Sequence, residues 1–254
     1  MKDQSGMMET NAKKRVLILA ANPKATPKLR LDEEVREIKE GLQRSKYRDR
    51  FEIHSVWAVR RRDLRRALLD YKPHIVHFSG HGAMDGLKLE DKMGYAVTVS
   101  KEALPGLFEI FSGKVECVIL SACFSGPQAT AISKHIDYVI GMKKEIDDKA
   151  AIEFAVGFYD ALGGGESVED AFKLGRNAVQ FEFPDLRDYL IPVLKKRKSR
   201  NVKNDKEQVK NNGEGQRSIH NGERKASAII TNNFGGINNI AENVTNNYNF
   251  GNDN

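Results

Sequence analysis

Histidine and cysteine, residue types that act as base and nucleophile in hydrolytic enzymes, end two apolar runs of this chain. The run "HIVHFSGHG" (74–82) reaches His81, which stands between Gly80 and Gly82. The run "VECVILSAC" (115–123) ends at Cys123. In an open parallel sheet, sites form just beyond the carboxyl ends of the strands. We therefore expect His81 and Cys123 to meet if the two runs are neighbouring strands.

The chemistry available to such a pair is nucleophilic catalysis. A cysteine attacks as its thiolate, and a nearby histidine takes or balances the thiol proton. The amides of Gly82 and Cys123 are candidates to face a developing oxyanion. A helix predicted after Cys123 would turn its N-terminus toward the sulfur, where the helix dipole favours negative charge.

The other histidines and the second cysteine favour structural interpretations. Cys117 lies inside an apolar run, where cysteine is usually a core residue, and His77 lies inside its strand. His74 and His77 point to opposite faces of one strand, so these histidines share no metal geometry. We expect no metal and no cofactor. Cys123 alone is as compatible with a core position as with function, and its pairing with His81 favours function.

Apolar runs alternate with amphipathic segments through residues 15–194, which predicts an α/β domain with a mostly parallel sheet covered on both faces. The expected strands are 15–21, 51–59, 74–79, 115–122 and 137–142, with a hairpin over 85–100. The expected helices are 30–43, 62–71, 101–112, 127–135, 148–162 and 167–180.

The charge of the chain is concentrated outside this domain. The net charge is +6, yet residues 195–226 alone hold 11 Lys or Arg against 4 Asp or Glu. This segment has almost no large apolar side chain, so we predict a basic disordered linker. It also lacks aromatic residues for stacking on bases, so we expect no specific nucleic-acid binding. The first 14 residues are predicted to be a flexible N-terminus.

The chain has neither a long apolar run nor the apolar core of a secretory signal. It is therefore expected in the cytoplasm, without a membrane partner.

Residues 227–254 form a third kind of sequence, with 10 Asn among 28 residues and apolar residues at regular intervals. Asn ladders and stacked aromatic residues suit in-register cross-β assembly. We therefore predict an assembly motif, against the plain alternative of a disordered end. Its candidate residues are Phe234, Gly235, Ile237, Ile240, Val244, Tyr248 and Phe250.

Several separated segments resemble one family. "HFSGHG" and "VILSACFSG" resemble the histidine and cysteine motifs of the caspase, separase and gingipain clan of cysteine peptidases. "ANPKATPKLRLDEEVREI", "LRRALLDYKPHIVHFSGHG" and the segment from "YVIGMKKEIDD" to "GRNAV" are similar to its CHAT subgroup. The resemblance spans residues 14–194. It implies a caspase-like fold, a His81–Cys123 dyad without an acidic third member, and oxyanion amides at Gly82 and Cys123.

Three residues are candidates for the substrate pocket. Ser121 stands where metacaspases carry an acid, so a preference for a basic P1 residue does not transfer. Arg30, in a loop with Lys24 and Lys28, would favour an acidic P1 residue, although solvated loop charges are the favoured interpretation. Asp148 matches a recurring acid of the subgroup, but its position favours a helix N-cap.

The tail resembles the amyloid signalling motifs at the ends of bacterial immune effectors. Together the two resemblances imply a peptidase that a receptor with a matching motif recruits into self-assembled filaments. Clustered domains would then cleave a protein substrate, with a pore-forming death effector as one candidate. The alternatives are a catalytically silent adaptor that signals through the tail, and a different cysteine hydrolase on a flavodoxin-like sheet.

Overall fold

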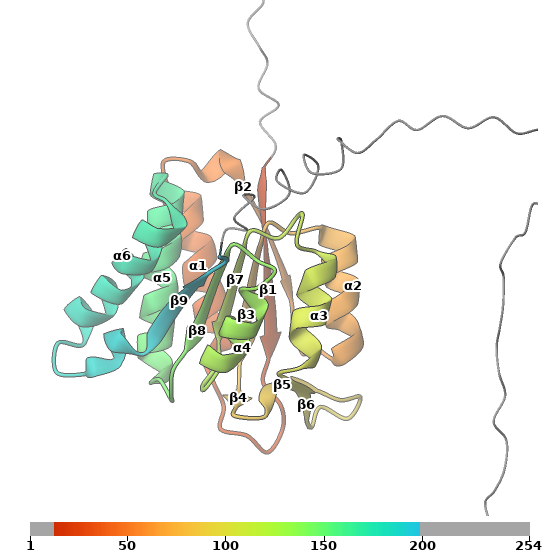
Figure 1. The fold of residues 1–254 in the computed structure, drawn as a ribbon. Helices are drawn as coiled ribbons and strands as arrows, with labels where there is room; N and C mark the ends of the chain where they lie inside the picture. The colour runs from red at the N-terminus through yellow and green to blue at the C-terminus, as the bar shows by residue number, and fades with distance from the viewer. Residues whose placement is uncertain (1–12, 199–254) are drawn as a thin grey trace, which may run out of the picture. The chain divides into compact units, whose positions relative to one another are not determined.

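The computed structural model describes residues 13–198 of the chain (Figure 1). The predicted N-terminal segment, apart from residues 13 and 14, lies outside the described residues. So do the linker beyond residue 198 and the whole assembly motif. The elements run in the order β1 (Lys14–Ala21), α1 (Leu31–Arg44), η1 (Arg48–Arg50), β2 (Phe51–Val56), α2 (Arg61–Tyr71), β3 (Ile75–Gly80), β4 (Gly82–Ala83), β5 (Gly86–Glu90), β6 (Ala96–Ser100), α3 (Ala103–Ile110), β7 (Cys117–Ser121), α4 (Gly126–Ile132), β8 (Tyr138–Met142), α5 (Asp148–Gly164), α6 (Val168–Glu182), η2 (Arg187–Leu190) and β9 (Pro192–Lys196).

A six-stranded sheet in the order β2-β1-β3-β7-β8-β9 forms the centre of the domain. The first five strands are parallel, and β9 pairs antiparallel with β8. Every residue of β3 and β7 is buried, as expected for central strands covered on both faces. The predicted α/β fold with a mostly parallel sheet is confirmed.

Helices cover each face of this sheet and enclose two separate cores (Figure 1). On one face α1 and α5 share a core with the odd-numbered residues of β3, Ile75 among them, and α6 packs mainly on α5. On the other, α2, α3 and α4 pack on the even-numbered residues, such as Val76 and Phe78. Because helices pack on both faces of the sheet, the ends of the strands are held in place. The loops that follow them at the carboxyl edge are held as well.

Three features depart from the sequence-based expectations. The predicted hairpin is part of a three-stranded antiparallel sheet in the order β4-β5-β6, because Gly82–Ala83 directly after His81 pairs with β5. Strand β9 was not expected, and it continues to Lys196, beyond the predicted domain end at 194. The N-cap interpretation of Asp148 is wrong. Asp147 caps α5 by accepting a hydrogen bond from the amide of Lys149, because it has the extended backbone that a cap requires.

Within residues 13–198, no helix combines the length and the apolar character needed to cross a membrane.

Candidate active site

The register of the sheet brings the two motifs together. Strands β3 and β7 are neighbours and parallel, and their pairing ends with Ser79 opposite Ser121. His81 and Cys123 each follow two residues later, so they leave the sheet level with one another. Both are partly exposed, in contrast to the fully buried strands that lead to them. The register therefore places His81 and Cys123 just beyond the ends of neighbouring strands, at the same edge of the sheet.

The two glycines beside His81 are required by close backbone contacts. A Cβ atom on Gly80 would lie 2.6 Å from the carbonyl oxygen of Ala21. A Cβ atom on Gly82 would lie 3.0 Å from the Cβ of Ala122 and closer still to the carbonyl oxygen of Cys123. The backbone after His81 therefore lies directly against the backbone of the cysteine motif. Only glycine allows this approach.

A main-chain carbonyl orients the imidazole of His81. Its Nε2 lies 2.8 Å from the carbonyl oxygen of Pro27, in the loop between β1 and α1. Since a carbonyl only accepts, Nε2 must carry the proton and donate. In the neutral ring this leaves Nδ1 as the basic nitrogen. No sequence signal points to Pro27, because a main-chain oxygen leaves no signature in residue type.

The backbone of His81 is fixed as well. Its carbonyl oxygen accepts a hydrogen bond of 2.9 Å from the amide of Lys88 on β5. The histidine is thus held from both sides, by β5 through its backbone and by Pro27 through its ring.

The turn that carries Cys123 is held by a buried serine. Ser125 Oγ donates to the carbonyl oxygen of Leu120 and accepts from the amide of Met142, both at 2.9 Å. Phe124, which lies between Cys123 and Ser125, has a φ of +56°, a left-handed conformation that costs energy in a residue other than glycine. The bonds of Ser125 tie this turn to both β7 and β8. Helix α4 then begins at Gly126, one residue before the predicted start at 127.

The second histidine and cysteine lie in the core, as expected. Cys117 is completely buried, and burial raises the pKa of its thiol. His77 is equally buried, with its ring nitrogens 3.1 Å from Glu34 Oε1 and 3.2 Å from the hydroxyl of Tyr159. Ser79 donates to the other oxygen of Glu34. These side chains form one closed, buried polar network between β3 and the helices α1 and α5.

Two of the three pocket candidates bind each other. The backbone amide and Nε of Arg30 both donate to Asp148 Oδ2, at 3.3 and 3.0 Å. The hydrogen bond to Asp148 raises the pKa of Arg30. Arg30 also pairs with Glu33 at 3.0 Å. The third candidate, Ser121, is a buried residue at the end of β7, two positions before Cys123.

Among residues 13–198, no group of three or more His, Cys, Asp or Glu side chains is placed to hold a metal ion.

Comparison with known proteins shows the family of the chain. Residues 8–180 match the CHAT domain family. The chain is 31% identical over 182 residues to a "Probable protease" of Gillisia limnaea, a match covering 70% of this chain and 32% of that protein. It is 26% identical over 186 residues to a "Roc-COR-CHAT protease" of an unknown prokaryotic organism, covering 70% and 18%. The matches thus span a third or less of either relative.

Among solved structures, a secreted C11 cysteine protease from Bacteroides thetaiotaomicron aligns with a TM-score of 0.49 at 14% identity, over 67% of this chain and 59% of that one. The family match alone covers more than half of the sequence, and it includes both the His81 and the Cys123 motifs. The chain belongs to the CHAT domain family.

Proposed function

We propose that the chain is a caspase-like cysteine endopeptidase in which Cys123 is the nucleophile and His81 the base. The observation that carries this proposal is the register of β3 and β7, which sets the two residues level at the carboxyl edge with Gly82 packed against Cys123. The family membership and the protease names of the two relatives support it.

The chemistry follows from the orientation of the histidine. Pro27 holds the proton on Nε2, so Nδ1 accepts the thiol proton of Cys123. The thiolate adds to the scissile carbonyl carbon, and the amides of Gly82 and Cys123 are the proposed donors to the resulting oxyanion. The imidazolium then gives its proton to the leaving amine. Water, deprotonated by His81, hydrolyses the thioester and restores the thiol.

The pair formed by Arg30 and Asp148 has a positioning role in this scheme. It ties the β1–α1 loop to the start of α5, and the same loop supplies the carbonyl of Pro27. Because these two charges neutralise each other, neither is available as a simple charged determinant of the P1 residue. Ser121, next to the site at the end of β7, remains a pocket candidate.

The proposed mode of activation is assembly through the C-terminal segment. The Asn-rich motif at residues 227–254 would join filaments seeded by a receptor with a matching motif, which raises the local concentration of peptidase domains. The role proposed for the assembled enzyme is that of an effector in bacterial immunity or regulated cell death. Its substrate would be a protein, with a pore-forming effector as the candidate.

A proteolysis assay tests the enzyme proposal. The full chain, alone and seeded into assemblies, is incubated with a peptide mixture derived from a bacterial proteome, and new termini are identified by mass spectrometry. We expect cleavage that disappears in Cys123→Ala and persists in Cys117→Ala. If wild type and Cys123→Ala give the same termini in every state, the peptidase proposal is wrong. If Cys123→Ala also keeps the cellular effect, the adaptor alternative replaces it.

A further inference from the structure

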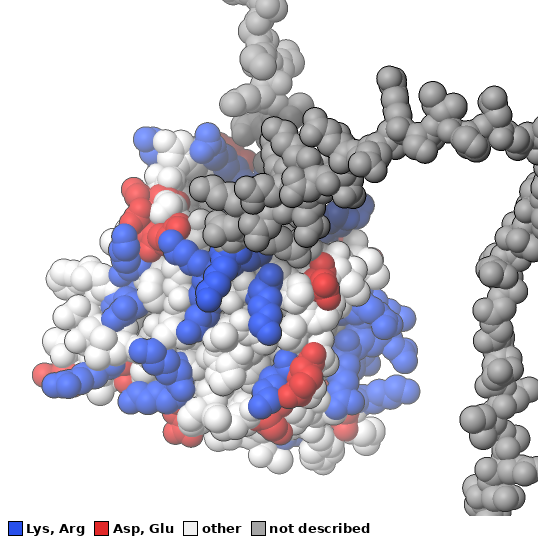
Figure 2. Space-filling view, viewed as in Figure 1, with Lys and Arg blue, Asp and Glu red and all other residues white. Residues whose placement is uncertain are grey.

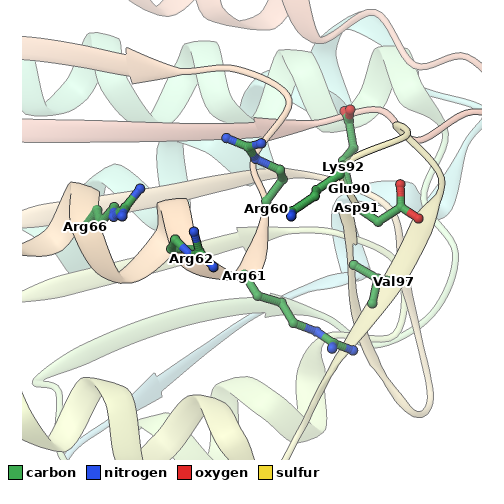
Figure 3. A pocket seen from close by; sticks show the side chains of 8 residues that line it. All are labelled: Arg60, Arg61, Arg62, Arg66, Glu90, Asp91, Lys92 and Val97. Carbon is green, nitrogen blue, oxygen red and sulfur yellow. The ribbon is translucent and has the colours of Figure 1, made fainter.

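A basic groove lies between the start of α2 and the β5–β6 hairpin (Figure 3). It has a volume of about 400 Å³, and a second hollow of about 440 Å³ shares Arg61 with it and reaches Ser100. We call the two together the α2–β6 groove. Side chains that line it include Arg60, Arg61, Arg62, Arg65, Arg66 and Lys92. In the space-filling view, basic side chains gather at the right, over α2 (Figure 2).

The acidic side chains around this groove already have partners. Asp63 binds Arg60 at 2.7 Å. Glu90 accepts from the amide of Asn22 at 3.0 Å. Asp91 accepts from two amides of its own turn. These carboxylates are therefore engaged in holding the walls of the groove.

Three further arginines of α2 take no part in these contacts. Arg62, Arg65 and Arg66 are exposed on α2, and none of them forms an ion pair with an acidic side chain among residues 13–198. In Figure 3, Arg62 and Arg66 lie along the same helix beside the groove. A partner rich in carboxylates would supply the missing counter-charges, and guanidinium groups bind carboxylates with two parallel hydrogen bonds.

The groove also borders a free strand edge. Within the part of the chain that the structure describes, β6 pairs with β5 on one side only. Lys88 of β5 lies opposite Thr98 of β6. The amide of Lys88 donates to the carbonyl oxygen of His81, on the β4 side of β5. In an antiparallel pair, Thr98 must then turn its own amide and carbonyl away from β5. Arg61 Nη2 accordingly donates to the carbonyl oxygen of Thr98, at 2.6 Å.

We propose that the α2–β6 groove binds an extended acidic segment of a protein partner. The segment adds as a strand to the outer edge of β6, and its carboxylates pair with Arg62, Arg65 and Arg66. An amide of the bound segment donates to the carbonyl oxygen of Thr98 in place of Arg61. The guanidinium of Arg61 is then free to pair with a carboxylate of the segment. This surface goes beyond the proposed peptidase function and does not depend on it.

An acidic peptide fits this groove better than a nucleic acid does. By the same alternation, every second residue of β6 turns both an amide and a carbonyl away from β5, a spacing that a peptide backbone matches and a phosphodiester backbone does not. Binding of single-stranded nucleic acid also draws on aromatic side chains that stack on bases. None of the residues that line the groove is aromatic.

Fluorescence anisotropy on the full-length Cys123→Ala chain tests the proposal without any need for catalysis. The probe is a labelled ten-residue peptide of alternating Glu and Thr. We expect saturable binding that weakens roughly tenfold in Arg62→Gln/Arg66→Gln, because two guanidinium–carboxylate contacts are lost. The matched control, Arg48→Gln/Arg50→Gln, removes the same charge from η1 at the amino end of β2. It should change the affinity by less than about twofold.

Two further probes separate the strand-pairing claim from simple charge attraction. A peptide of the same charge, N-methylated at alternate residues, cannot donate to β6 and should bind several-fold more weakly. Equal weakening by the two double variants, or equal binding of the methylated peptide, would overturn the proposal. So would tighter binding of a single-stranded oligonucleotide of equal charge. A chain that binds the peptide but cleaves nothing would refute only the peptidase proposal.

Discussion

Strands β3 and β7 each carry their reactive residue type twice, once inside the sheet and once beyond its edge. The inner pair, His77 and Cys117, is completely buried. The outer pair, His81 and Cys123, is partly exposed. The same two residue types on the same two strands therefore occupy opposite environments only four to six residues apart.

The difference between the two pairs lies in what surrounds them. The partners of His77 are the side chains of Glu34 and Tyr159, in a closed network that leaves no room for a substrate. The ring of His81 is bound by one main-chain carbonyl, that of Pro27, which leaves its other nitrogen available. In the proposed mechanism, reactivity therefore depends on the strand end and on the loop that faces it, and residue type alone does not determine it.

Removing the outer pair should have the largest effect. We expect Cys123→Ala and His81→Ala each to lower cleavage by at least about 1000-fold, since nucleophile and base act as a unit. Cys117→Ala should stay within about fivefold of wild type. Rates on a peptide identified in the proteolysis screen measure this. A Cys117→Ala chain as inactive as Cys123→Ala would erase the distinction between the pairs.

The inner network should determine stability. Glu34→Ala leaves His77 and Ser79 buried without their shared acceptor, and we expect it to lower the free energy of unfolding by about 3–5 kcal/mol. Denaturant unfolding followed by circular dichroism measures the loss. The milder Tyr159→Phe removes one hydrogen bond and should cost about 1 kcal/mol. A loss below about 1 kcal/mol in Glu34→Ala would show that the network contributes little.

The close approach of the two motifs can be tested at Gly82. An added methyl group in Gly82→Ala would collide with Cys123, and we expect cleavage to fall about 100-fold as the two residues move apart. Gly113→Ala is the matched control, because a Cβ atom there meets nothing within 4 Å. Cleavage rates of both variants, compared with wild type, measure the effect. An active Gly82→Ala enzyme would mean that this contact does not position the site.

The smallest effects concern the two acids at the start of α5. Asp147→Ala removes the helix cap and should cost about 1 kcal/mol in stability, with little change in cleavage. Asp148→Ala frees the loop that holds Pro27 and should lower cleavage several-fold at a small cost in stability. Thermal unfolding measures the change in stability of each variant, and initial rates measure the change in cleavage. The reverse pattern would restore Asp148 as the cap.

The sequence predicts what depends on local pattern and misses what depends on the main chain. The alternation of strand and helix patterns was sufficient to predict the parallel strands of the sheet, because buried parallel strands are continuous apolar runs. Glycines around a histidine at a strand end were the signal for the candidate site. The short, lysine-rich β9 carries no such pattern. The carbonyl of Pro27 and the choice between Asp147 and Asp148 depend on backbone geometry that residue types do not encode.

Alkylation of the two cysteines tests the central claim most directly. The full chain is treated with iodoacetamide from pH 6 to pH 9, and modification of Cys117 and Cys123 is followed separately by mass spectrometry, in wild type and His81→Ala. Because burial raises the pKa of Cys117, that thiol stays unmodified in the folded chain and serves as the internal reference.

We expect Cys123 to react rapidly at neutral pH and to slow markedly in His81→Ala, in the free or the assembled chain. A Cys123 that reacts no faster than an ordinary exposed thiol in both states, with or without His81, would contradict the account.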